Sequence, residues 1–117
     1  MRKLLLLLVV AGIALAGIAA TSLAATTKTV KGTSSNRWSP STLSVKKGDK
    51  IKFTWNNTGA PHDVRKTSGS GGSLTANKIS TKGTATFSVP STAKKGKKWT
   101  FICSVHAGTM KLTATVR

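Results

Sequence analysis

Apolar and polar side chains alternate along most of the chain after residue 24, and this two-residue period constrains the fold more than any other feature. In Ile51-Lys52-Phe53-Thr54-Trp55, for example, Ile51, Phe53 and Trp55 fall on one face of a strand. No stretch sustains the 3.6-residue period of an amphipathic helix. Strands are predicted at Thr27–Lys31, Leu43–Val45, Ile51–Trp55, Thr84–Val89, Trp99–Cys103 and Leu112–Val116. The sequence therefore predicts an all-β domain, either a sandwich or a barrel.

The first 24 residues have the pattern of a secretory signal peptide. Arg2 and Lys3 precede the uncharged apolar run Leu4–Ala20, and Ser22-Leu23-Ala24 places small residues where a signal peptidase reads them. We expect cleavage after Ala24, which leaves residues 25–117 as the folded domain. The alternative is an uncleaved membrane anchor, since the apolar run is close to the shortest length that spans a bilayer.

Ser68–Ser73 is a low-complexity run of Ser and Gly. A linker at this position would leave two pieces that are each too short to fold readily alone. We therefore interpret it as a flexible surface loop within one domain.

The chain is strongly basic, with 19 Lys and Arg against two acids, Asp49 and Asp63, and a formal charge of +17. Two acids leave little scope for paired-carboxylate catalysis. Eight lysines form two groups, Lys46, Lys47, Lys50, Lys52 and Lys94, Lys95, Lys97, Lys98. They indicate either a solvated face or electrostatic steering toward an acidic redox protein or an anionic membrane surface. Nucleic acid is not expected as a partner, because the aromatic residues fall on the predicted core faces and the chain is predicted to be exported.

A single Cys, Cys103, excludes internal disulfides, thiolate clusters and a two-thiolate dinuclear copper centre. It begins the run Cys103-Ser104-Val105-His106-Ala107-Gly108-Thr109-Met110, and His62 is the only other histidine. Two imidazoles, one thiolate and one thioether match the donor set of a blue-copper site, in which the thioether is a weak axial ligand. The set His62, Cys103, His106 and Met110 is therefore the candidate metal site.

Other interpretations of these residues remain open. Cys103 and His106 could form a nucleophilic pair in a hydrolase, although no Asn or acid is obviously placed to orient the histidine. Zinc suits the set poorly, because a thioether is a weak zinc ligand. Met110 shares a strand face with Leu112, Ala114 and Val116 and could be a core residue. A cationic β-sandwich adhesion module with incidental Cys and His is a further alternative.

The stretches Trp38–Asn57, Pro61–Val64 and Phe101–His106, followed by Met110, resemble the small cupredoxins of the plastocyanin and azurin group. The resemblance implies a Greek-key β-sandwich in which His62, Cys103, His106 and Met110 hold one mononuclear type 1 copper ion. It also implies that Asp63, at a position where Asn is more familiar, ties the ligand loops together by hydrogen bonds. Three residues separate His106 from Met110, between the four of plastocyanin-like loops and the two of amicyanin-like loops.

From this resemblance we expect a periplasmic or secreted one-electron carrier that catalyses no reaction of its own. The alternative is a copper scavenger or delivery protein that uses the same ligands. His106 is the expected electron portal, because Ala60, Pro61, Ala107 and Gly108 nearby are small and uncharged. We expect a monomer whose partners are redox proteins with acidic docking surfaces.

Overall fold

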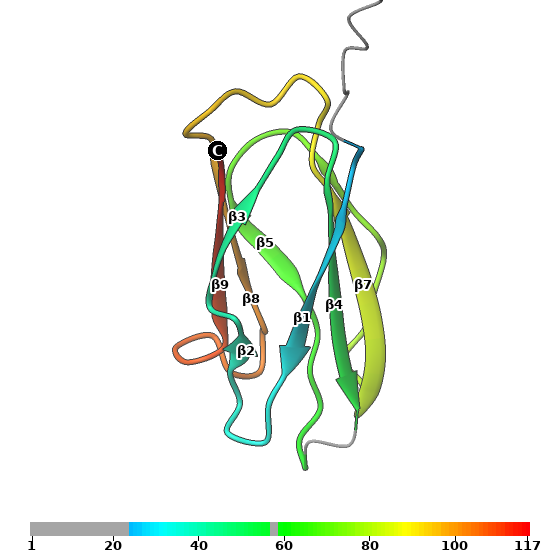
Figure 1. The fold of residues 1–117 in the computed structure, drawn as a ribbon. Coiled ribbons are helices and arrows are strands. Elements are labelled where there is room, and N and C mark those ends of the chain that lie inside the picture. Colours follow the sequence, from blue (N-terminus) through cyan, green and yellow to red (C-terminus); the bar gives the residue numbers. More distant parts are fainter. Residues whose placement is uncertain (1–23, 57–58) are drawn as a thin grey trace, which may run out of the picture.

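Two β-sheets pack face to face in the computed structural model, which describes residues 24–56 and 59–117 (Figure 1). The strands are β1 (Thr27–Gly32), β2 (Trp38–Ser39), β3 (Thr42–Val45), β4 (Lys50–Asn56), β5 (Arg65–Ser68), β6 (Ser73–Leu74), β7 (Lys82–Ser88), β8 (Lys98–Ile102) and β9 (Lys111–Val116). Within these two ranges no helix is long and apolar enough to cross a membrane. The predicted signal peptide lies outside the described residues except for Ala24.

The strand order shows how the chain crosses repeatedly between the two sheets. One sheet has the order β2-β1-β4-β7-β6 and the other β3-β9-β8-β5. β1 runs parallel to β4 and β3 runs parallel to β9, while the other neighbouring pairs are antiparallel. Parallel neighbours cannot be joined by a tight hairpin, and the connection from β1 to β4 passes through β3 of the other sheet. The predicted all-β Greek-key sandwich is confirmed.

The six predicted strands all form, each within two residues of its expected bounds. The largest difference is in β7, which begins at Lys82 rather than Thr84 and ends at Ser88. Three further strands were not predicted: β2, β5 and β6. β2 and β6 have only two residues each, and all four residues of β5 are exposed, so none of them carries an alternating apolar pattern.

The core lies between the sheets and is built from the alternating faces that the sequence predicted. Ile51, Phe53 and Trp55 of β4 are all buried, while Lys50 and Lys52 are exposed. The β4 and β8 faces meet where the rings of Phe53 and Phe101 approach to 5.1 Å between centroids. Burial of large apolar side chains on both inner faces is the main force holding the sheets together.

The glycine- and serine-rich run connects β5 to β6 and packs tightly against aromatic side chains of both sheets. The indole nitrogen of Trp99 donates to the carbonyls of Ser70 (3.0 Å) and Gly71 (3.2 Å). Gly72 has φ +74°, and a Cβ built there would lie 2.2 Å from the Phe87 ring. The run was interpreted as a flexible loop, but its glycines permit a close approach of backbone to aromatic rings.

Candidate metal centre

Three potential ligands converge at one end of the sandwich. The Cys103 sulfur lies 3.7 Å from Nδ1 of His62 and 3.8 Å from Nδ1 of His106. One donor atom from each residue lies within 4.8 Å of the others, and the two imidazole rings are 5.1 Å apart between centroids. Both histidines therefore direct the same ring nitrogen toward the thiol, as a shared metal ion requires.

His62 is held by a short bridge to Ser80. The His62 amide donates to the Ser80 carbonyl (2.9 Å), and the Ser80 amide donates back (3.0 Å). The Trp55 indole also donates to the Ser80 carbonyl (2.9 Å), which fixes this segment against the end of β4. Burial, and then the neighbouring His106, lower the pKa of His62. The imidazole is therefore held neutral, with a nitrogen lone pair for a metal.

Cys103 and Met110 form the two ends of a compact loop between β8 and β9, at the lower end of Figure 1. The Cys103 amide donates to the Met110 carbonyl (3.0 Å). The His106 carbonyl accepts from the amides of both Thr109 (3.1 Å) and Met110 (2.8 Å). This tight turn accommodates the three-residue spacing between His106 and Met110.

Met110 is fully buried just before β9. A Cβ built on Gly32, at the end of β1, would lie 3.0 Å from the Met110 methyl group. Gly32 thus leaves room for the thioether to lie over the end of the sheet. Leu112 and Ala114 are buried on the same side of β9, so the position also suits core packing.

Asp63 ties the two ligand-bearing segments together, as the resemblance implied. Its carboxylate accepts from the Ser104 amide and from the Ser104 hydroxyl, both at 2.7 Å, and pairs with Arg65 at 2.9 Å. Burial alone would raise the pKa of Asp63, but the Ser104 donors and the Arg65 charge outweigh it and hold the pKa below its usual value. The residue after His62 is thereby locked to the residue after Cys103.

Several supporting residues had no signal in the sequence. Ser104 and Ser80 are ordinary serines until the fold places them beside Asp63 and His62. Asn77 clamps the segment after Asp63 by accepting from the Val64 amide (2.8 Å) and donating to the Val64 carbonyl (3.1 Å). The adjacency of Ser104 to Cys103 is the one clue that could have singled it out.

The spacing of these donors fits a metal ion. Bonds of about 2.0 Å to imidazole and about 2.3 Å to thiolate, meeting at about 120°, would separate nitrogen from sulfur by about 3.7 Å. The two observed separations are 3.7 Å and 3.8 Å. Two imidazoles and one thiolate are the in-plane donors of type 1 copper, and Met110, whose carbonyl accepts from the Cys103 amide, carries the thioether that completes this donor set.

A family model described as copper binding proteins, plastocyanin/azurin family, matches residues 24–117. The chain belongs to this cupredoxin family. Copper is therefore the cofactor that the site suits, and the cluster of His62, Cys103, His106 and Met110 fits one type 1 ion. A search of curated proteins finds no match.

Solved structures share the cupredoxin fold at low sequence identity. A pseudoazurin from Sinorhizobium is 20% identical with a TM-score of 0.55, over 79% of this chain and 74% of that one. A methionine-to-glutamine mutant of amicyanin, in the Cu(I) form, is 18% identical with a TM-score of 0.57, over 78% and 82%. Oxidised plastocyanin from Dryopteris crassirhizoma is 19% identical with a TM-score of 0.52, over 76% and 99%.

The exposed residues next to His106 in the ligand loops of this cupredoxin are uncharged. His106 itself is partly exposed, whereas His62 and Cys103 are fully buried. Pro61, Ala107 and Gly108 are exposed, and Val105 is 44% exposed. Of the three donors, His106 alone therefore reaches the molecular surface, within a small uncharged rim.

Proposed function

We propose that this cupredoxin is a one-electron carrier in which His62, Cys103, His106 and Met110 would hold the copper ion. The convergence of both Nδ1 atoms on the Cys103 sulfur at 3.7 Å and 3.8 Å carries the proposal. Members of this family are generally electron carriers, which supports the same function.

The four residues would hold a copper ion that supplies one-electron chemistry between Cu(II) and Cu(I) when bound, with the electron coming from a reduced partner and going to an oxidised one. The chain contributes a set of donors that is already arranged. Asp63 and Ser104 lock the two ligand segments, and the turn at His106 fixes Met110 relative to Cys103. Because the donors need not move and three of them, His62, Cys103 and Met110, are shielded from water, little rearrangement would accompany the transfer.

His106 is the proposed route for the electron. Its ring is the partly exposed member of the ligand set, and small uncharged residues surround it. A partner can approach such a surface closely without displacing bulky side chains or desolvating charges. Partners with acidic docking surfaces are favoured, because both acids of this chain are buried and its surface is cationic.

The proposed compartment lies outside the cytoplasm. The signal peptide predicted at residues 1–24, with cleavage after Ala24, would deliver residues 25–117 as a monomeric domain to the periplasm or the medium. A lone buried thiol is compatible with an oxidising compartment when a metal binds it.

A copper scavenger or delivery protein would use the same ligands. Delivery requires a metal that a chelator or an acceptor protein can reach. Full burial of His62 and Cys103 opposes such exchange, so electron transfer is the function that the site supports best.

The ligand assignment is tested by adding Cu(II) to the purified protein and to a Cys103→Ser variant. We expect an intense blue absorption band in the parent protein, because thiolate-to-copper charge transfer produces it, and no such band in the variant. A Ser104→Ala variant is the control for folding and should keep the band. A blue band that survives Cys103→Ser, or a parent protein that retains no copper, would contradict the assignment.

A further inference from the structure

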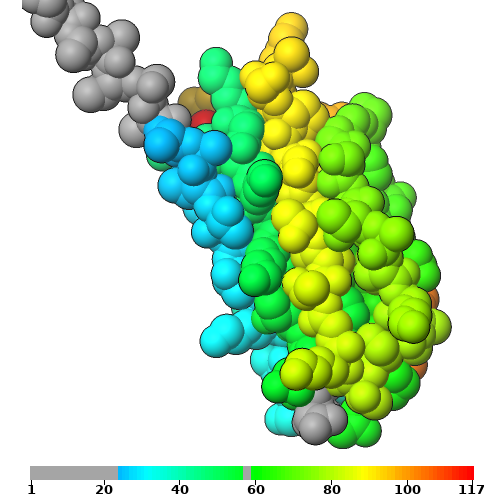
Figure 2. Space-filling model, turned by 90° about the vertical axis from the view of Figure 1, so that its right-hand side faces the viewer, coloured from blue at the N-terminus to red at the C-terminus, as the bar shows by residue number. Residues whose placement is uncertain are grey.

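The end of the sandwich opposite the metal centre carries a dense group of cations, which we call the basic end. Figure 2 shows the β3–β4 turn and the segment after β7 projecting side by side at this end. Seven lysines and the last residue of the chain contribute: Lys46, Lys47, Lys50, Lys94, Lys95, Lys97, Lys98 and Arg117. Most are exposed, and Lys97 is partly buried.

Backbone hydrogen bonds hold the segments of the basic end together. The Gly48 amide donates to the Pro90 carbonyl (3.3 Å), and the Val89 amide donates to the Asp49 carbonyl (2.8 Å). The Arg117 amide donates to the Val45 carbonyl (2.9 Å), which joins the last strand to the same turn. The charges therefore sit on one fixed surface rather than on independent loops.

No exposed acidic side chain offsets this charge, because the two acids of the chain are Asp49 and Asp63 and both are buried. Asp49 lies beneath the basic end, where its carboxylate accepts from the amides of Thr26 (3.0 Å) and Lys46 (2.8 Å). Asp63 lies at the metal centre. Asp49 offsets one of the eight positive charges, and the remaining excess attracts anions from outside the chain.

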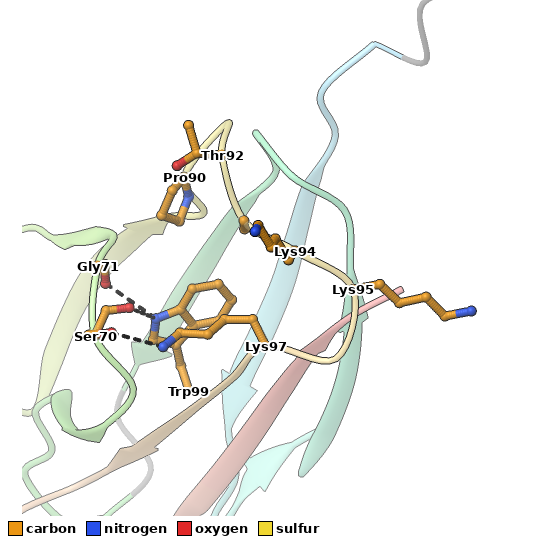
Figure 3. Close-up of a pocket in the computed structure, with 9 residues that line it drawn as sticks. Ser70, Gly71, Pro90, Thr92, Lys94, Lys95, Lys97 and Trp99 are labelled. Atoms are coloured by element: carbon orange, nitrogen blue, oxygen red, sulfur yellow. Dashed lines mark hydrogen bonds between the residues drawn. The ribbon is translucent and has the colours of Figure 1, made fainter.

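A hollow of about 430 Å³ opens within the basic end (Figure 3). Pro90, Ala93 and Gly71 form part of its wall, and Lys94 and Lys97 border it. The Lys97 ammonium donates to the Ser70 hydroxyl (2.9 Å) and lies 5.9 Å from the centre of the Trp99 ring. A mixed apolar and cationic hollow of this kind suits an anionic headgroup with its attached glycerol.

The position of the basic end argues against a redox partner there. β8 runs from Lys98, at the basic end, to Ile102, next to Cys103, and the five residue steps from Lys98 to Cys103 cover about 16 Å. Electronic coupling falls steeply with distance, so a redox protein bound at the basic end would exchange electrons with the copper more slowly than one bound beside His106. The cations of the basic end are therefore better placed for a partner that takes no electron, while the general positive charge of the surface still attracts acidic redox partners.

The start of the described chain lies at the same end. The Thr26 amide and hydroxyl both donate to Asp49, which fixes the beginning of the domain against the β3–β4 turn. In the sequence, the apolar run Leu4–Ala20 precedes this point by only a few residues. If the run is retained, it would tether the basic end to the bilayer.

We propose that the basic end docks on the headgroups of an anionic lipid bilayer, with the metal centre facing away from the membrane. Three observations favour a lipid bilayer as the partner. They are the excess of positive charge, the hollow bordered by Lys94 and Lys97, and the start of the domain at Thr26. Binding of the basic end to lipid does not depend on the proposed function. Only the role of the opposite end as the electron portal rests on that function.

The test uses the exported form of the protein and measures its affinity for phosphatidylcholine vesicles and for vesicles that also contain phosphatidylglycerol. The readout is the difference between these two affinities, because a retained apolar segment would insert into both kinds of vesicle. Each lysine near an anionic surface contributes roughly fivefold to affinity at low salt. We expect the variant Lys46→Gln/Lys47→Gln/Lys94→Gln/Lys95→Gln to lower the preference for anionic vesicles by at least about tenfold.

The matched control is Lys31→Gln/Lys78→Gln/Lys82→Gln/Lys111→Gln, which removes the same charge near the metal centre. It should keep most of the preference, and added salt should weaken binding of the parent protein. Equal losses in both variants would overturn the proposal, because net charge alone would then explain binding. A parent protein that binds polyglutamate but not the anionic vesicles would also overturn it, in favour of an acidic protein partner.

Vesicle binding is measured on the copper-free protein as well, so that it does not depend on electron transfer. Copper-loaded protein on anionic vesicles should still reduce a soluble oxidant at the rate seen in solution. A rate that collapses on binding would show the metal centre facing the membrane and would overturn the orientation.

Discussion

Asp63 brings a formal negative charge to a position that touches both ligand-bearing segments. It keeps the hydrogen bond to the Ser104 amide that a neutral amide side chain would also accept, and Arg65 partly balances its charge. A negative charge beside copper favours the oxidised, more positive ion. The residue therefore combines a structural tie with an electrostatic effect on the site.

Asp63→Asn should separate these two effects. It retains an oxygen for the Ser104 amide and removes the charge, so we expect the blue band to persist and the midpoint potential to rise by on the order of tens of millivolts. Voltammetry measures the shift. Asp49→Asn makes the same charge change at the far end and should leave the potential nearly unchanged. A lower potential in Asp63→Asn would contradict the electrostatic role.

Met110→Leu tests whether the thioether ligates copper or only fills the core. The two side chains are similar in volume, so stability should fall by less than about 1.5 kcal/mol, measured by urea unfolding of the copper-free protein. As an axial ligand, the thioether tunes the potential, and its loss should raise the potential while the blue band remains. An unchanged potential would assign Met110 to packing alone.

The candidate ligands could be named from the sequence because they belong to scarce residue types. With one Cys and two His in the chain, few combinations exist, and Met110 follows within the same short run. Ser104, Ser80 and Arg65 could not be found in this way. Their roles depend on which segments the fold brings together, and common polar residues carry no mark of a distant partner.

At the scale of the elements, the run between β5 and β6 has the composition of a flexible loop but packs against aromatic rings. Gly72→Ala would combine a left-handed backbone with a Cβ 2.2 Å from the Phe87 ring. We expect it to lower the free energy of unfolding by about 3 kcal/mol or more, from strain plus overpacking.

Gly48→Ala is the matched control for this change. Gly48 also has positive φ, +81°, but a Cβ there meets nothing within 4 Å. The loss in that variant should be about 1 kcal/mol, from backbone strain alone. Equal losses in the two variants, measured by urea unfolding, would show that the contact with Phe87 carries no cost.

The long strands were predictable because one face of each is buried. β4 and β9 alternate buried with exposed or partly exposed positions along their whole length. β5 pairs with β8 along the edge of its sheet but buries none of its four side chains, so its backbone hydrogen bonds leave no trace in the side-chain pattern. A strand that is held only by backbone hydrogen bonds cannot be predicted from the pattern of apolar side chains.

At the scale of the whole molecule, we propose that one end of the sandwich exchanges electrons and the other end binds lipid. The proposed electron portal lies in the uncharged rim around His106, and the lysine group lies at the other end. Ala107→Gln places a bulky neutral side chain in the rim. At high salt, which screens charge repulsion, we expect it to slow electron self-exchange between Cu(I) and Cu(II) protein several-fold.

Ser91→Gln, at the basic end, is the control and should exchange at the parent rate. Both rates come from NMR line broadening in mixtures of the two oxidation states, and the blue band should be intact in both variants. If Ala107→Gln also exchanges at the parent rate, the electron does not pass through the His106 rim.

The central claim is that the copper changes oxidation state while it stays bound. Cyclic voltammetry of the copper-loaded protein, in the presence of a Cu(I) chelator, tests it most directly. We expect one reversible one-electron couple whose amplitude persists over repeated cycles, because the buried Cys103 and His62 hold the ion in both states. Loss of the couple to the chelator on the first reduction would contradict electron transfer and favour copper delivery instead.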